Sequence, residues 1–457
     1  MSVYTLIITY LYFMKKRTLR RSVALTFCAC SLGVSVVCQG QTSQLQEGVN
    51  DMFRTAEAHN ASLVAVKAAI RESEAGIETA RMSKLPEVQG QASVSYLGNA
   101  RLWNRHFGES TSAPMPHYGN NFLLHAEQVL YAGGAIKGGI KLAEQGAQMS
   151  RLDAEEERQR VRFALVSLYL QMHSFHNQQA VYAANMDLAE QQISLMAKRR
   201  EQGVSLRNDV TRYELQLQQM TLGETSVTDQ QDIVRQQLLT ALGTDSVSLQ
   251  LLSENAFDES ALEVDPESSW LQLAANNHLG LQKAQLATDM GRTQETLVKA
   301  DRLPKVALVA EDHLDGPITI EVPPINKNLN YWYVGVGVSY NFSSLYKAKR
   351  RLKQAQLNTA LAADRKEVLS QQVTDAVHAA YVNLHTAQTA LSTCRKSVQL
   401  ASENYDVVSN RYRSGLALVT DLTDAASMKL DAELALVNAR IQLVQSFYAL
   451  KYAAHAL

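Results

Sequence analysis

The chain has 457 residues, of which 46% are hydrophobic, and its 44 basic residues are balanced by 45 acidic ones. Its length predicts two or three domains, and its composition is that of an ordinary folded protein. With no basic excess, the chain lacks the charge that a nucleic acid partner requires. The eight prolines avoid residues 117–265 and 325–457. Because proline costs about 3 kcal/mol inside a helix, both stretches permit very long helices.

Residues 1–40 predict a cleaved signal peptide. A basic cluster at residues 15–21 precedes an apolar run at residues 22–37, and Cys-Gln-Gly follows before Gln41. The alternative is a membrane anchor, but the apolar run is shorter than the roughly 18–20 residues that a spanning helix needs. Cleavage would remove the basic cluster and no acidic residue, so the mature chain would be net acidic.

Three of the four cysteines lie in this segment, which leaves Cys394 as a lone thiol. The mature chain is therefore expected to have no disulfide framework and no cysteine metal site. Cys38 has an alternative role as a lipidated cysteine, although Val37 before it is a poor fit for that processing. The start of translation is open between Met1 and Met14, because the basic cluster directly follows Met14.

The chain carries the same unit twice, at a constant shift of about 212 residues. Leu-Pro-x-Val begins at Leu85 and again at Leu303, and residues 161–222 share eleven identities with their shifted partners, where chance would give roughly four. Each copy has the same order of parts: a helix, Leu-Pro-x-Val, two alternating segments and a long helical stretch. A repeat of this kind predicts one design used twice around an axis. The predicted organisation is a signal peptide (1–40), a first repeat (41–243) with a hairpin near 86–131, a linker (244–267), and a second repeat (268–457) with a hairpin near 304–343.

Each repeat is predicted to open with a helix, over residues 44–82 in the first copy and 268–300 in the second. Asn60 and Asn277-His278 lie at corresponding places in these two helices.

Four segments with period-2 alternation predict strands. The clearest spans residues 331–342, and the others are 88–96, 121–131 and 306–310. Such alternation places one face in an apolar medium and the other in water, and aromatic residues at both ends are typical of membrane strands. A soluble, half-buried sheet fits the pattern about as well. In the membrane interpretation, the lipid-facing residues are Trp332, Val334, Val336, Val338, Tyr340 and Phe342.

The rest of each repeat is predicted to be helical. A helix is expected from about 136 to 201, and its apolar stripe recurs 212 residues later. About 65 residues at 1.5 Å each would reach about 100 Å, far more than a globular domain needs. Gln202-Gly203 and Ser414-Gly415 are expected to break the long helices, with a return helix after each. Residues 244–267 are acidic and irregular, and they join the copies.

Four strands cannot close a barrel, because the smallest single-chain membrane barrels use eight. An open sheet edge in lipid leaves unpaired backbone groups that cost several kcal/mol each. If the strands lie in a bilayer, several copies must therefore associate. Two copies would leave little lumen, whereas three would supply twelve strands and room for a pore.

The chain resembles the TolC family of outer-membrane efflux channels over nearly all of residues 44–457. The resemblance rests on the duplication, on Leu-Pro-x-Val before each hairpin, on Leu-Tyr-Ala-Gly-Gly at residues 130–134, and on the helix-break motifs at residues 199–210 and 411–425. It implies a fold that is mainly α with a small β part: a long antiparallel α-helical barrel and a transmembrane β-barrel, closed by trimerisation. It further implies an exit duct in the outer membrane of a Gram-negative bacterium, extending into the periplasm, in a tripartite efflux or type I secretion system.

The resemblance also implies partners and site residues. The partners are two further copies in a homotrimer, a periplasmic adaptor, an inner-membrane pump or ABC exporter, and outer-membrane lipid. Adaptor contacts would lie at the helix tips, at Gly203, Val204, Gly415 and Leu416. The periplasmic entrance would be narrowed by Asp421 and Asp424, with Tyr412 and Asp209 beside them.

Two observations weigh against a simple transfer of these roles. Some family members carry an arginine two residues after the second break glycine, but this chain has Ala417 there, so a salt-bridge latch at that position is not expected. Asp421 and Asp424 also fit an ordinary role as acids at a helix N-terminus, where the helix dipole favours them.

No residue pattern makes a case for catalysis, and no cofactor or metal is expected. His173 and His176 lie one helical turn apart, but histidines on a helix are more often ordinary polar residues than ligands. The competing function is a periplasmic coiled-coil scaffold or adaptor with a soluble sheet. The resemblance implies that the inner-membrane pump selects the exported substrate, because the lumen is shared between copies.

Overall fold

The computed structural model describes residues 44–203, 206–245, 264–321 and 324–457, with side chains from Val49 onward. The expected signal peptide, Val204 and most of the expected linker lie outside these ranges. The described chain is mostly helical with a small sheet, so the predicted fold class is confirmed at that level.

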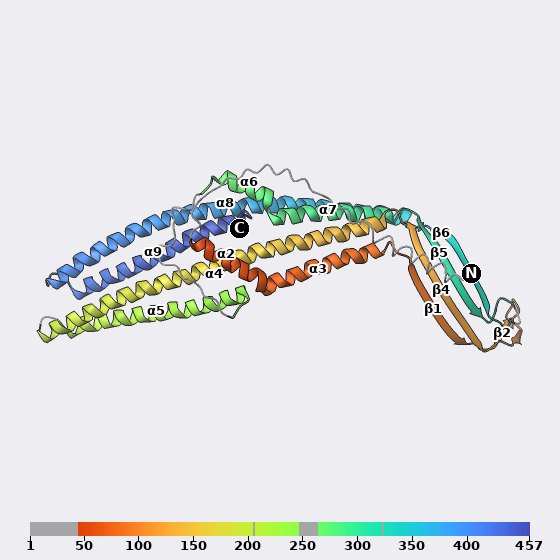
Figure 1. Ribbon diagram of the computed structural model, residues 1–457, viewed down its shortest axis with the longest axis horizontal. Helices are drawn as coiled ribbons and strands as arrows, with labels where there is room; N and C mark the ends of the chain where they lie inside the picture. Colours follow the sequence, from red (N-terminus) through yellow and green to blue (C-terminus); the bar gives the residue numbers. More distant parts are fainter. Residues whose placement is uncertain (1–43, 204–205, 246–263, 322–323) are drawn as a thin grey trace. The chain divides into compact units, whose positions relative to one another are not determined.

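Two long helical hairpins dominate the fold. Helix α4 (Ala135–Glu201) is followed by α5 (Arg207–Leu242), and α8 (Ser344–Arg413) by α9 (Val419–Ala453). In each pair the shorter helix packs back along the longer one, as Figure 1 shows. The predicted long helices and their breaks are therefore confirmed.

The opening helix of each repeat differs from its prediction, because each is two helices. Helices α2 (Gln44–His59) and α3 (Ala61–Met82) meet at Asn60, and α6 (Glu267–Asn277) and α7 (Leu279–Ala300) meet at His278. Asn60 Oδ1 accepts the Leu63 backbone N–H at 3.1 Å, and His278 Nδ1 accepts that of Gly280 at 3.1 Å. Both residues are N-caps, and they occupy the corresponding places that the repeat indicated.

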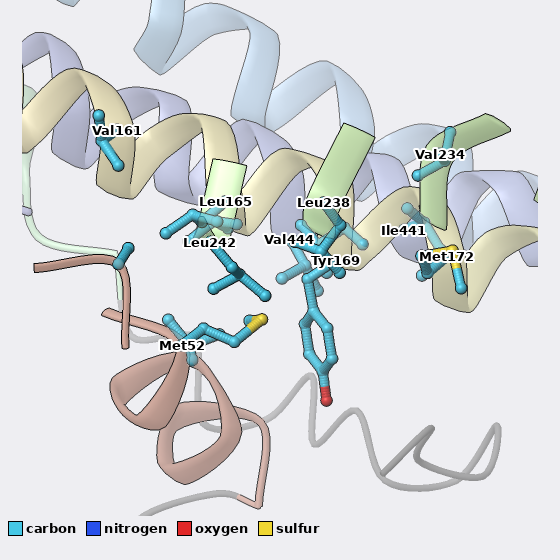
Figure 2. Packing of buried hydrophobic residues seen from close by; sticks show 14 of the residues in the cluster. Met52, Val161, Leu165, Tyr169, Met172, Val234, Leu238, Leu242, Ile441 and Val444 are labelled. Carbon is cyan, nitrogen blue, oxygen red and sulfur yellow. The ribbon is translucent and has the colours of Figure 1, made fainter. Parts of the chain in front are cut away.

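A hydrophobic cluster joins the helices of both repeats around α4. Leu165 and Leu170 of α4 and Leu238 of α5 are 0% exposed. Figure 2 shows that Met52 of α2 and Ile441 of α9 reach the same cluster. The apolar stripe predicted for α4 therefore lies in a core to which both repeats contribute. The equivalent stripe on α8, 212 residues later, lies in a second cluster that contains Val373, Val377 and Leu384.

Four strands form one antiparallel sheet in the order β1-β4-β5-β6. They are β1 (Glu87–Tyr96), β4 (Tyr118–Tyr131), β5 (Lys305–Gly316) and β6 (Leu329–Ser339). The hairpin of one repeat is joined to that of the other where β4 pairs with β5. Strands β1 and β6 lie at the two ends of this order, so each is paired on one side only within the described chain.

The strand boundaries correct the prediction in three places. β5 continues to Gly316, well past the predicted 306–310. β6 ends at Ser339, so Tyr340 and Phe342 lie beyond the strand, where the Asn341 side chain and carbonyl accept the Ser343 and Ser344 N–H groups. The segment between the predicted strands 88–96 and 121–131 contains a further hairpin, β2 (Ala100–Trp103) with β3 (Ser110–Ala113).

The register gives the sheet two chemically different faces. On one face the rows are largely apolar, for example Val88, Ala126, Ala310 and Val334. The neighbouring row on the opposite face contains Gln89, His125, Glu311 and Tyr333. Alternation along each strand thus becomes a division between the two faces across the whole sheet.

None of the helices within the described ranges combines the length and the apolar character that crossing a membrane requires.

Candidate functional site

The two helix breaks have the same backbone geometry. Gly203 and Gly415 both have φ of 76°, and the Gly203 and Gly415 N–H groups donate to the carbonyls of Arg200 and Tyr412 at 2.9 and 3.0 Å. A left-handed residue just past the end of a helix favours glycine, because a Cβ would be strained there. The shared Gly of the two motifs is therefore explained by a shared turn.

An aspartate closes each turn at the start of the return helix. Asp209 Oδ2 accepts the Leu206 N–H at 3.1 Å, and Asp421 Oδ2 accepts the Leu418 N–H at 3.0 Å. Each carboxylate satisfies a backbone donor that the helix leaves free and also lies at the positive end of the helix dipole. The capping role of Asp421 is thus a feature of the fold, while its side chain stays exposed. Asp424, one turn further along α9, is exposed as well.

The tips of the two hairpins pack against each other through a third hydrophobic cluster. It contains Met196 of α4, Tyr213 of α5, Tyr412 of α8 and Leu422 of α9. Tyr412, expected near the entrance, is 7% exposed in this single chain, so its ring belongs to the packing between the repeats. The cluster makes the two tips one unit.

Tyr213 is the most buried polar side chain of this cluster, at 1% exposure. Its hydroxyl finds no hydrogen-bond partner within the described residues. Burial raises the pKa of Tyr213, and the nearby hydroxyls of Tyr405 and Tyr412 act in the same direction. A buried hydroxyl without a partner costs free energy in the packed state.

Arg199 crosses from the first repeat to the second at the same level. Its guanidinium lies 5.7 Å from the centroid of the Tyr412 ring, and its Nη1 donates to the Tyr412 carbonyl at 3.3 Å. A second donor, Nη2, reaches the Arg413 carbonyl. The repeat partner, Arg411, instead donates within its own turn, to the Leu416 carbonyl at 3.4 Å. The sequence showed this pair as an identity and gave no sign that the two arginines have different partners.

Both described tips carry exposed leucines. Leu206, Leu416 and Leu418 are 71%, 69% and 69% exposed. A Cβ added at Gly203 or Gly415 would meet no atom within 4 Å. The tips thus present accessible leucines beside open glycine turns.

Four of the six residues expected to face lipid share one face of β6. Trp332, Val334, Val336 and Val338 are 61%, 56%, 65% and 68% exposed. Tyr340 is not part of the strand, and Phe342, 73% exposed, precedes α8. Such a row of apolar side chains needs an apolar surrounding.

Within the described ranges, no group of three or more His, Cys, Asp or Glu side chains has an arrangement that could hold a metal ion.

Comparisons with known proteins agree with this geometry. The family model of outer membrane efflux proteins matches residues 52–244 and 270–454. The chain is 21% identical over 382 residues to the outer membrane protein TolC of Salmonella enteritidis, a match that covers 82% of this chain and 75% of that protein.

Two solved structures share the fold. The CmeC outer membrane channel of Campylobacter jejuni has a TM-score of 0.72 at 15% identity, covering 95% of this chain and 94% of CmeC. The open state of the MtrE outer membrane channel of Neisseria gonorrhoeae has a TM-score of 0.70 at 16% identity, covering 89% and 88%.

Proposed function

The chain belongs to the outer membrane efflux protein family, and we propose that it is the exit duct of a tripartite efflux or type I secretion system. An efflux channel of the outer membrane is what the family and the relatives support directly. The proposal adds the assembly, the periplasmic extension and the partners. Its domain plan is a signal peptide at 1–40, repeats at 41–243 and 268–457, and a linker at 244–267.

The observation that carries the proposal is the two-faced sheet with unpaired edges. Its order, β1-β4-β5-β6, leaves one side of β1 and one side of β6 free to pair. Lipid contains no water to satisfy those backbone groups, so the free edge of β6 would pair with β1 of another copy. Three copies would close twelve strands around a lumen wide enough for solutes.

The same closure would arrange the helical hairpins side by side as a conduit through the periplasm. Helices α4 and α8, with 67 and 70 residues, would each span about 100 Å at 1.5 Å per residue. Solutes delivered by an inner-membrane pump or ABC exporter would leave passively through this conduit. The choice of substrate would then rest with that transporter.

The helix tips would form the periplasmic entrance and the contact with a periplasmic adaptor. The exposed Leu206 and Leu416 beside Gly203 and Gly415 supply an apolar surface for adaptor hairpins. Asp421 and Asp424 on α9, with Asp209 on α5, would place carboxylates from three copies near one axis. Such a ring would attract cations and repel anions.

A direct test is to purify the full-length protein in detergent and to measure its mass by light scattering, followed by recordings in planar lipid bilayers. The proposal expects a trimer, migration that changes on heating, and discrete conductance steps. A monodisperse monomer that conducts no current would contradict it and would favour the periplasmic scaffold instead.

A further inference from the structure

The polar face of the sheet carries a continuous series of close polar contacts between side chains of two strands. Lys305 Nζ lies 2.7 Å from Glu127 Oε1, and the other oxygen of Glu127 lies 3.8 Å from His125 Nε2. His125 Nδ1 lies 2.7 Å from Glu311 Oε1. This sequence of contacts joins β4 to β5 through side chains that share one face.

The same series of contacts continues along β5 toward Gly316, where the strand ends. Glu311 Oε2 lies 2.8 Å from His313 Nε2, and His313 Nδ1 lies 3.8 Å from Asp315 Oδ2. Asp315 in turn accepts the Asn121 side-chain N–H at 2.6 Å. The His313 ring stacks on Tyr331 of β6, with ring centroids 4.6 Å apart. We call these linked residues (Lys305, Glu127, His125, Glu311, His313 and Asp315) the polar ladder.

The register explains why these side chains meet. Glu311 of β5 lies directly opposite His125 of β4 on one side and Tyr333 of β6 on the other. His313 of β5 lies opposite Tyr331 of β6. On the same face of β1, Glu87 is opposite Glu127 and Gln89 is opposite His125. The titratable and charged residues of this face, over all four strands, are Glu87, His125, Glu127, Lys305, Glu311, His313, Asp315, Tyr331 and Tyr333.

The charge of this face depends on its two histidines. Four carboxylates against one lysine leave a net charge of about −3 while both imidazoles are neutral, and about −1 when both are protonated. Histidine is the side chain whose charge ordinarily changes between about pH 5 and 8. Two of the ladder's carboxylates, Glu311 and Asp315, lie beside His313, so protonation neutralises charge where it is densest.

We infer that the polar ladder is a charge filter inside the channel, which favours small cations over anions at neutral pH and loses that preference as the histidines become protonated. The inference rests on the proposed function, because only closure of the sheet by further copies turns this face toward a lumen. Three ladders on the wall of one water-filled lumen would add to the field that a permeating ion experiences.

The test compares the ion selectivity of reconstituted full-length channels at two pH values. Reversal potentials are recorded in a KCl gradient at pH 8 and pH 5.5. For the unmodified channel we expect the K⁺ over Cl⁻ permeability ratio to fall by about twofold or more between pH 8 and pH 5.5. The variant His125→Asn/His313→Asn should keep the ratio of pH 8 at both values, and Glu311→Gln should lower the ratio already at pH 8.

Asp312→Asn is the matched control. Asp312 is the neighbour of Glu311 on the same strand but belongs to the opposite face, where its carboxylate accepts the Asn330 side-chain N–H at 2.9 Å. This variant should behave as the unmodified channel does. Repeating the series with Asp421→Asn/Asp424→Asn separates the ladder from the entrance, since the pH effect should persist there.

The outcomes distinguish the two proposals. Absence of any conductance in the unmodified protein would contradict the proposed function. Conducting channels whose pH effect survives in the double histidine variant would overturn the ladder alone. The single variants His125→Gln and His313→Gln, checked for heat-modifiable migration, supply the same comparison if the double variant does not assemble.

Discussion

The guanidinium of Arg199 lies over the ring of Tyr412 and donates to the carbonyl of the same residue, so the first repeat holds the end of the long helix of the second. Ala417 occupies the position at which a latch arginine would lie. Arg199 therefore provides a different connection between the tips, one that lies within a single chain.

Replacing Arg199 by alanine should loosen this connection. Hydrogen bonds from a charged donor contribute on the order of 1–3 kcal/mol, so the tips should separate more often. We expect longer open times and a higher mean conductance in planar bilayers for Arg199→Ala. Arg200→Ala is the matched control, because Arg200 is its exposed neighbour. Equal conductance in the two variants would show that Arg199 does not hold the tips together.

Replacing Asp421 and Asp424 together by alanine should weaken block of the channel by divalent cations. Both carboxylates are exposed at the start of α9, where a ring from several copies would bind cations. The measurement is single-channel block by a divalent cation added on the side of the helix tips. Unchanged block would leave Asp421 with its capping role only.

The capping role itself predicts a loss of stability. Asp421→Ala removes the acceptor of the Leu418 N–H, and Asp209→Ala removes that of Leu206. Each should lower the free energy of unfolding by about 1 kcal/mol, measured from thermal melts by circular dichroism. Asp424→Ala, one turn beyond the cap, should leave the melt within error. A large effect of Asp424→Ala would mean that it has an unrecognised structural contact.

The cap at the α6–α7 junction should be sensitive to pH because it is an imidazole, whereas the cap at the α2–α3 junction is an amide. Burial, with the neighbouring His455, lowers the pKa of His278 to about 4, while Glu156 opposes this shift. In the unfolded chain the imidazole has its ordinary pKa near 6.5. Between about pH 4 and 6.5 the unfolded chain therefore binds more protons than the folded protein does. The stability contributed by His278 is therefore complete above pH 6.5 and is lost as the pH falls toward 4.

The variant His278→Asn tests this by giving the second junction the cap that Asn60 supplies in the first. At acid pH this variant should lose on the order of 1 kcal/mol less of its free energy of unfolding than the unmodified protein does. The value is set below what the full pKa shift would give, because the imidazole is only half buried. Melting temperatures at pH 7.5 and pH 5 measure the difference. The converse variant, Asn60→His, should make the first junction pH-dependent. If His278→Asn melts with the pH profile of the unmodified protein, the acid sensitivity arises elsewhere.

The two tip glycines should not tolerate a side chain, for a reason of conformation rather than space. Gly415→Ala would meet no atom within 4 Å but would force a φ of 76° on alanine. The expected loss is about 1 kcal/mol or more in the free energy of unfolding. Gly139→Ala is the control, since Gly139 lies within α4 and also has open space around it. That change should be neutral or slightly stabilising, because alanine favours a helix.

The sequence by itself determined the duplication, the two long helical hairpins, their glycine breaks and the two faces of the strands. These features are local: a left-handed turn selects glycine, and side chains on a strand alternate whatever lies beside it. The repeat also placed Asn60 and His278 at equivalent positions. It did not show that the opening helix of each repeat ends there and a second helix begins, because capping depends on which backbone donors the surrounding packing leaves free.

Only the tertiary structure decided which residues meet. Arg199 and Arg411 are identical in the repeat, yet one reaches across to Tyr412 and the other stays in its own turn. His125 and Glu311 are 186 residues apart and become neighbours because β4 pairs with β5 in one particular register. The alternation fixes which face of a strand is polar. The pairing of distant strands, which depends on the packing of the whole chain, decides which charges share that face.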